Sequence, residues 1–284
     1  MQTIIFLLSF VFGTAIGSFL NVVSMRLPQD ESIGGRSRCN SCKKQLRWFE
    51  LVPIVSFVMQ KGRCRSCGVV LSVQYPLVEL GTGLLFATAA LYLFSYFPLN
   101  FSLFLFVWLW ACSVIAVAVA IIAADMRFQL IPDSLTACLV ILAIPVVVFR
   151  AYYPMFQLIA PNLQAHAVIS QWSFWASVLG DIASAAVCML FLFCLWFFSG
   201  GKWMGFGDVK LIFATSLLVG FPAAVPALLF SFWTGALVGV VLLFLGAKTL
   251  QSKIPFGPFI LLGATLAFFF SEKLLMLVTG GVLF

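Results

Sequence analysis

Residues 101–124 read FSLFLFVWLWACSVIAVAVAIIAA, a run without a single charge, and Asp125 follows directly. Crossing a hydrocarbon core of about 30 Å takes roughly 20 helical residues, so this stretch predicts a membrane-spanning helix. A carboxylate at membrane depth is expensive, and its presence is by default a sign of function. The combination of an apolar run and an acid at its edge recurs at Asp208.

The composition is that of a membrane protein. Of 284 residues, 63% are hydrophobic and 9% are charged, whereas soluble domains carry roughly 25% charged residues. These values predict an all-α polytopic membrane protein with about eight transmembrane helices and one small soluble insert. The apolar segments lie at residues 3–25, 76–96, 101–124, 135–152, 172–198, 209–221, 223–246 and 255–282. The segment at 209–221 is short, so a tilted or partial span is expected there.

The distribution of charge predicts the orientation in the membrane. The formal net charge is +7, and residues 26–65 hold nine Lys and Arg against three acids. A basic loop beside membrane spans is typical of a cytoplasmic segment facing anionic lipid, and this position argues against nucleic acid as a partner. With the first span retained and its N-terminus outside, 14 basic residues face the cytoplasm and only Arg150 and Lys273 lie outside.

The predicted soluble insert, residues 26–75, carries two Cys-x-x-Cys pairs. Cys39 and Cys42 form the first pair, and Cys64 and Cys67 form the second. Two such pairs at this spacing suit a tetrahedral structural zinc site, while reduced or redox-active thiols are the weaker alternative. The other cysteines lie in spans and are expected to be apolar fillers; these are Cys112, Cys138, Cys188 and Cys194.

The insert divides the chain into three predicted parts. Residues 1–25 are the first transmembrane helix, residues 26–75 are the cytoplasmic tetracysteine insert, and residues 76–284 are the transmembrane bundle. An insert this small lacks a sizeable core, so a metal cross-link is expected to stabilise it.

Asp125 and Asp208 are predicted to face the same side of the membrane. Two carboxylates that meet there would form an acid/base dyad, although the sequence does not show that they touch. Asp125 has a simpler reading as an interfacial acid paired with Arg127. Asp208 follows Gly205-Phe206-Gly207 and precedes a span, so a helix cap remains an alternative.

Three other acids have less specific readings. Asp133 precedes a span and is favoured as a helix cap, Glu79 either snorkels or lines a site, and Asp181 lies near the end of a span. The only histidine, His166, lies in the predicted external loop at 153–171. Acid/base chemistry on the cytoplasmic face therefore depends on carboxylates.

Several motifs together resemble bacterial type IV prepilin peptidases, and they span nearly the whole chain in the order of that family. They are Gly17-Ser18-Phe19-Leu20-Asn21 with Arg26-Leu27-Pro28, the two cysteine pairs, Arg47-Trp48-Phe49-Glu50, Tyr75-Pro76-Leu77-Val78-Glu79, Leu130-Ile131-Pro132-Asp133, Gly205-Phe206-Gly207-Asp208-Val209-Lys210-Leu211 and Pro255-Phe256-Gly257-Pro258. Each motif alone is weak, but the set is specific. The usual Asn-Ile before Pro53 is replaced by Leu51-Val52, and the external loop is long for the family.

The resemblance implies a membrane aspartic protease with a Gly-x-Gly-Asp motif, whose catalytic acids are Asp125 and Asp208 in this chain. Its implied substrates are prepilins and pseudopilins of pilus or type II secretion systems, cut after a glycine at the end of a basic leader. The intact cysteine insert resembles that of bifunctional members, which also N-methylate the new terminal residue using S-adenosylmethionine. The residues of this second activity are not placed by the sequence, and Glu79 is no more than a candidate for it. The implied location is the bacterial inner membrane.

Two other function classes are weighed against this one. A transporter with a proton relay predicts acids near mid-bilayer and inverted repeats, whereas the acids here lie at span ends and no repeat is visible. A non-enzymatic scaffold predicts that removing either carboxylate leaves function unchanged.

Overall fold

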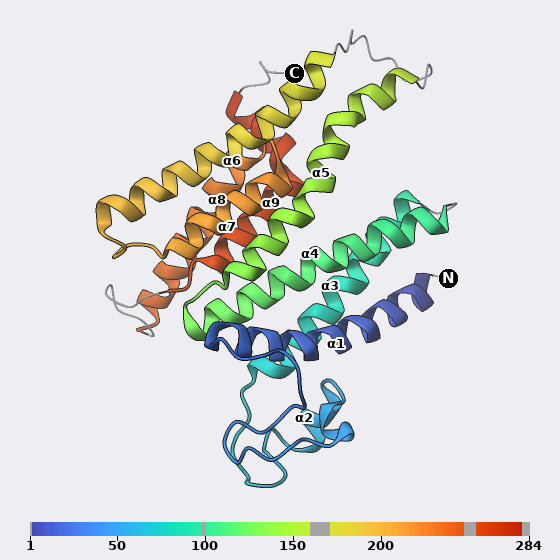
Figure 1. Ribbon diagram of the computed structural model, residues 1–284, viewed down its shortest axis with the longest axis vertical. Coiled ribbons are helices and arrows are strands. Elements are labelled where there is room, and N and C mark those ends of the chain that lie inside the picture. The colour runs from blue at the N-terminus through green and yellow to red at the C-terminus, as the bar shows by residue number, and fades with distance from the viewer. Residues whose placement is uncertain (1, 98–99, 160–170, 247–253, 280–284) are drawn as a thin grey trace. The chain divides into compact units, whose positions relative to one another are not determined.

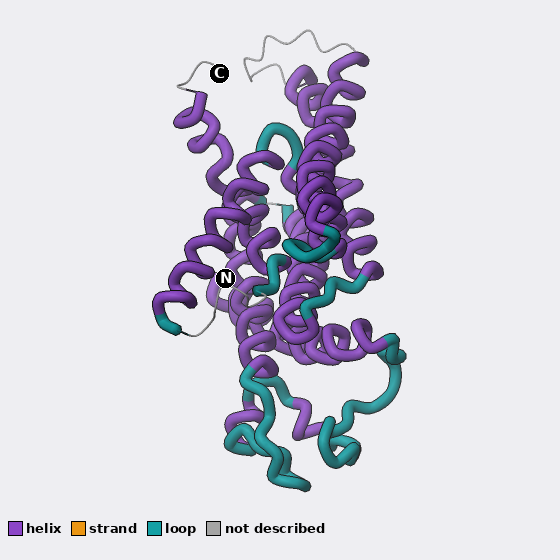
Figure 2. The backbone as a smooth tube through the Cα atoms, turned by 90° about the vertical axis from the view of Figure 1, so that its left-hand side faces the viewer, coloured by secondary structure: helices purple, strands orange, loops and turns teal. Residues whose placement is uncertain are grey.

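The computed structural model describes residues 2–97, 100–159, 171–246 and 254–279. Within these ranges the chain is helical apart from loops and two isolated β-bridges (Figure 2). The helices are α1 Gln2–Arg26, η1 Leu27–Gln29, η2 Trp48–Leu51, α2 Val55–Met59, α3 Gln74–Tyr96, α4 Phe101–Phe128, α5 Asp133–Ile159, α6 Gln171–Ser199, α7 Phe206–Val219, α8 Ala224–Phe244 and α9 Gly257–Thr279. The predicted all-α membrane fold is confirmed.

Each of the eight predicted apolar segments forms a helix, but they differ in length. Among the described residues, six helices are long and apolar enough to cross a membrane: α1, α3, α4, α5, α6 and α8. The apolar part of α9 is shorter, at Gly257–Phe270. Helix α7 has 14 residues and rises about 21 Å, less than a hydrocarbon core of about 30 Å. The chain is therefore a multi-pass membrane protein, and the count of eight crossings stays a prediction.

The first part of the predicted external loop, residues 153–159, is helical. Helix α5 continues to Ile159 instead of ending near residue 152. The remainder of that loop, with His166, lies outside the described residues. The chain divides into two compact units, Met1–Phe128 and Gln129–Phe284, and the three-part division predicted from the sequence stays a prediction.

In the first unit, α1 and α3 pack closely through small residues. A Cβ added at Gly13 would lie 2.8 Å from the Cα of Gly83, and one added at Gly17 would lie 2.8 Å from the Cα of Glu79. Small residues at spacing four let membrane helices approach backbone to backbone. The Asn21 amide donates to the carbonyl oxygen of Tyr75 at 3.1 Å and connects the ends of the two helices.

The insert between α1 and α3 is mainly loop, with the short helices η2 and α2 (Figures 1 and 2). The guanidinium of Arg26, at the end of α1, donates to the carbonyl oxygens of Ser32, Ile33 and Gly34 at 2.6–3.2 Å. These bonds fold the first part of the insert back over the helix end.

In the second unit, α7 packs against α5, α6, α8 and α9 (Figure 1). Its Leu217 joins a buried cluster with Ala143 and Val147 of α5 and Ala185 of α6. Eight of its residues are buried. The short α7 is therefore an internal helix of this unit, and its position fixes that of Asp208.

An ion pair between the buried Asp181 and the half-buried Arg150 holds the C-terminal end of α7. Arg150 Nη1 lies 2.6 Å from Asp181 Oδ2, and Arg150 Nη2 donates to the carbonyl oxygen of Leu218 at 2.8 Å. The backbone N–H of Phe221 donates to Asp181 Oδ1 at 2.7 Å. Gly220 adopts φ +77° beside the guanidinium, where a Cβ would overlap it. The positive φ and the lack of space for a Cβ both explain why this residue is glycine.

Candidate functional site

Asp208 lies in the first turn of α7 and is 8% exposed. Its Oδ2 accepts a hydrogen bond from the backbone N–H of Gly205 at 3.2 Å, so the carboxylate closes the start of the helix. The positive end of the helix dipole favours a negative charge there. Asp208 is therefore the third residue of the helix and bonds back to the N-cap residue Gly205, which fixes the direction of the carboxylate.

The glycine next to Asp208 has a packing role. A Cβ added at Gly207 would lie 3.0 Å from Cβ of Ile131, so a side chain here would push α7 and the segment before α5 apart by a few tenths of an ångström. Gly207 thus faces Ile131.

Lys210 and Asp133 join the starts of α7 and α5. Lys210 Nζ donates to both oxygens of the Asp133 carboxylate, at 2.7 and 2.9 Å. The same ammonium lies 4.9 Å from the ring centroid of Phe206. The favoured sequence reading of Asp133 was a helix cap; the structure adds this ion pair, which is partly exposed and joins residues 77 positions apart.

Asp125 lies in the last turn of α4 and is 5% exposed. Its neighbours Ala123 and Ala124 are buried, and the Gln74 amide donates to the carbonyl oxygen of Ala123 at 2.9 Å. The Arg127 guanidinium lies 5.7 Å from the ring centroid of Phe128. Asp125 belongs to the first unit and Asp208 to the second, so the structure describes each acid within its own unit.

Glu79 is buried on α3 and has a partner in the insert. Its Oε2 accepts a hydrogen bond from the backbone N–H of Ile54 at 2.7 Å. Ile54 adopts φ +61°, which is unusual for a β-branched residue. The carboxylate thus holds the strained start of α2, a partner that no local sequence pattern indicated.

The four insert cysteines converge. The sulfur atoms of Cys39, Cys42, Cys64 and Cys67 all lie within 4.8 Å of one another, and those of Cys39 and Cys67 are 3.9 Å apart. Tetrahedral zinc with Zn–S bonds of about 2.3 Å requires sulfur–sulfur distances of about 3.8 Å. The geometry therefore fits a four-thiolate metal site.

The two cysteine pairs adopt the same backbone conformation. In the first, the N–H of Cys39 donates to the carbonyl of Lys44 and the N–H of Lys43 donates to the carbonyl of Cys39. In the second, the N–H of Cys64 donates to the carbonyl of Val69 and the N–H of Gly68 donates to the carbonyl of Cys64. Each loop is closed by an antiparallel bridge, Arg38 to Gln45 and Arg63 to Val70. The insert is thus a structural repeat around the four-cysteine cluster.

The protonation of the thiols also fits a metal. Hydrogen bonds from the backbone N–H groups of Cys67 and Ser66 lower the pKa of the Cys64 thiol to about 7. The backbone N–H of Val69 lowers the pKa of Cys67, but desolvation and hydrogen bonds with the other three sulfurs outweigh it and raise the pKa to about 11. Close thiols resist losing all their protons, and a divalent cation removes that conflict.

Sequence reasoning brought the right cysteines together but missed three polar pairs: Glu79 with Ile54, Lys210 with Asp133, and Arg150 with Asp181. Only the last left a signal, since opposite charges inside two apolar spans need each other in lipid.

Two family models match the chain. The bacterial peptidase A24 N-terminal domain matches residues 11–93, and the type IV leader peptidase family matches residues 103–240. The first match contains the cysteine insert and Glu79, and the second contains Asp125 and Asp208. No solved structure gives a significant match.

Several relatives match this chain, at least two of them over most of their length. A prepilin leader peptidase/N-methyltransferase of Burkholderia pseudomallei is 31% identical over 95% of this chain and 87% of its own. One of Bacillus subtilis is 31% identical over 94% of each chain. One of Myxococcus xanthus is 56% identical over 78 residues, 27% of this chain. With this identity and coverage, the chain belongs to the prepilin leader peptidase/N-methyltransferase family of membrane proteases, enzymes that combine peptidase and methyltransferase activity.

Proposed function

We propose that this chain removes the leader peptide from type IV prepilins and pseudopilins at the cytoplasmic face of the bacterial inner membrane. The observation that carries the proposal is the position of Asp208, buried in the first turn of an internal helix and bonded to the N–H of Gly205, in a chain of this family. The second acid is Asp125, buried in the last turn of α4.

The connection between α4 and α5 limits the separation of these two acids. Asp125 precedes Ile131 by six positions, a stretch that spans at most about 22 Å when extended. Ile131 packs on Gly207, directly beside Asp208. The covalent link therefore limits how far the Asp125 carboxylate lies from the start of α7, without setting the distance.

In the proposed mechanism the two carboxylates share one proton, since like charges a few ångströms apart cannot both ionise cheaply. The deprotonated acid takes a proton from water as the water attacks the scissile carbonyl. The protonated acid polarises that carbonyl and then protonates the leaving amine. The pair titrates as a unit, so neither role belongs to one residue in advance.

The membrane supplies the alignment of the substrate. The apolar helix of a prepilin stays in lipid, while its basic leader stays in water on the cytoplasmic side. The cut therefore lies at the depth of the helix ends that carry Asp125 and Asp208. The cytoplasmic orientation is supported by the 14 basic residues predicted on that side, and contact with anionic lipid follows from it.

The four cysteines of the insert would hold one zinc ion, which cross-links the two halves of the structural repeat. The second proposed activity is N-methylation of the new terminal residue, with S-adenosylmethionine as the methyl donor, as the names of the relatives indicate. No residue is assigned to the donor. In Glu79, a candidate from the sequence, one carboxylate oxygen already accepts a hydrogen bond from the N–H of Ile54.

Co-expression of the chain with one prepilin, followed by mass spectrometry of the product's N-terminus, tests both activities. The expected product starts directly after the leader glycine and carries one added methyl group. An intact leader in the presence of well-expressed, membrane-inserted protein would contradict the peptidase proposal.

A further inference from the structure

Helix α2 in the insert has two different faces. Phe57 points inward, because a Cβ added at Gly62 would lie 3.1 Å from its ring. Val55, Val58 and Met59 are spaced i, i+3 and i+4 and so share the opposite face. They are 51%, 67% and 79% exposed. These three side chains are called the α2 face below.

An exposed aromatic residue lies in the element next to this face. Trp48 belongs to η2, which packs against α2, and it is 80% exposed. Tryptophan is enriched where a membrane meets water, since its ring is apolar and its N–H is polar. Exposed apolar groups of this size in a small insert indicate a surface that another phase or molecule covers.

The attachment of α2 sets its depth. The N–H of Ile54, the residue just before α2, donates to Glu79 Oε2 at 2.7 Å. Glu79 is the sixth residue of the spanning helix α3, about 7.5 Å along its axis from the first residue. The polar interfacial layer of a bilayer is about 5–7 Å thick on each side. The start of α2 is therefore held beside the first two turns of a membrane-spanning helix.

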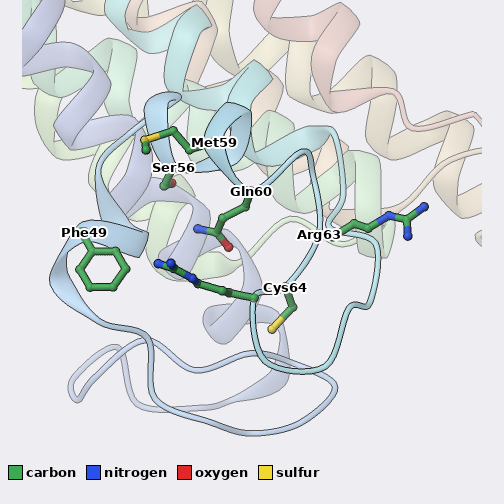
Figure 3. A pocket seen from close by; sticks show the side chains of 7 residues that line it. Phe49, Ser56, Met59, Gln60, Arg63 and Cys64 are labelled. Carbon is green, nitrogen blue, oxygen red and sulfur yellow. The ribbon is translucent and has the colours of Figure 1, made fainter.

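Basic and polar groups border the α2 face. A cavity of about 410 Å³ beside α2 is lined by Phe49, Ser56, Met59, Gln60, Arg63, Cys64 and Arg65 (Figure 3). In Figure 3, the Arg63 side chain extends away from the other labelled residues. The Arg65 guanidinium lies 5.5 Å from the ring centroid of Phe49. Arginine guanidinium groups match phosphate oxygens in charge and hydrogen-bond geometry.

We propose that the α2 face is an interfacial membrane anchor that inserts into an anionic phospholipid leaflet, with Arg63 and Arg65 binding lipid phosphates. Charge complementarity favours anionic lipid as the occupant of this surface, because residues 26–65 hold nine basic residues against three acids. An apolar helix face bordered by basic residues is the usual form of such an anchor. The bond from Ile54 to Glu79, which holds α2 beside the end of a membrane-spanning helix, supports the same occupant.

Quenching by brominated lipids tests this anchor in the full-length protein. A genetically encoded fluorescent amino acid replaces Val58, or Gln45 on the exposed first cysteine loop as the control, in lipid nanodiscs that hold one copy and no substrate. We expect acyl-brominated lipid to quench the label at position 58 about threefold more than the label at position 45. Equal quenching at the two positions would overturn the proposal.

The charge of the lipid provides a second arm. Replacing anionic lipid by zwitterionic lipid, or introducing Arg63→Gln with Arg65→Gln, is expected to lower quenching at position 58 about twofold. If neither the zwitterionic lipid nor the double substitution lowers the quenching at position 58, the role of the arginines is refuted. A label that responds only when a second copy or a prepilin is added assigns the face to that partner and overturns the anchor. If Val58 does not tolerate the label, Val55 on the same face takes its place.

Discussion

The Glu79 carboxylate of α3 accepts the backbone N–H of Ile54 at 2.7 Å, which ties the cysteine insert to a membrane-spanning helix. Replacing Glu79 by Ala leaves a half-buried N–H without this acceptor, a loss of about 1–3 kcal/mol at that point. We expect faster hydrogen exchange and easier proteolysis across α2. The matched control is Glu50→Ala, which removes only the local bond to the N–H of Arg47. Unchanged hydrogen exchange across α2 in Glu79→Ala would show that the Glu79–Ile54 hydrogen bond does not hold the insert to α3.

The metal site makes a stoichiometric prediction. Purified protein is expected to hold about one zinc per chain, and Cys39→Ser is expected to lose most of it, because a tetrahedral structural site needs all four thiolates. Elemental analysis measures both. Cys138→Ser removes a thiol of α5 outside the cluster and should leave the zinc content unchanged. Wild-type protein without metal, in which all four insert thiols are freely alkylated, would refute the site.

The repeat in the insert predicts an asymmetry between two equivalent positions. Lys43 and Gly68 follow the second cysteine of each pair and adopt φ +58° and +72°. A left-handed conformation costs a residue with a side chain roughly 1–2 kcal/mol, while glycine adopts it freely. Lys43→Gly should therefore retain zinc longer against a chelator, and Gly68→Lys should lose it sooner. If both variants changed the rate of zinc loss in the same direction, the two loops would not be equivalent.

The Arg150–Asp181 pair is expected to matter for stability. Asp181→Ala leaves the half-buried guanidinium and the Phe221 N–H without their shared acceptor, which should cost about 1–3 kcal/mol. Asp133→Ala removes an exposed pair and should cost about 0–1 kcal/mol. Thermal unfolding in detergent compares the two variants. Similar melting temperatures would mean that Asp181 does not hold the end of α7.

The apolar runs and the cysteine spacing were sufficient to predict most of the fold. Lipid requires long uncharged helices, and a metal requires ligands at fixed spacing, so both leave local patterns in the sequence. The run at 101–124 and the four insert cysteines are examples. The start of α7 at Phe206, three residues before the predicted segment, was missed because the glycines around it look like loop.

The polar pairs could not be predicted in the same way. Glu79 meets a backbone N–H 25 positions away, and Lys210 meets a carboxylate 77 positions away. Such contacts depend on how helices pack rather than on the residues beside them. Asp125 and Asp208 pose the same problem, since spacing along the chain identifies two buried acids but not their separation.

Substitution of the two acids tests the central claim most directly. Asp125→Asn and Asp208→Asn keep the shape of each side chain and remove the shared proton, and Glu31→Gln in the exposed insert loop is the control. With one prepilin co-expressed, we expect either Asn variant to reduce leader removal by at least about 100-fold and the control to process normally. Full processing by either well-expressed Asn variant would contradict the two-aspartate mechanism.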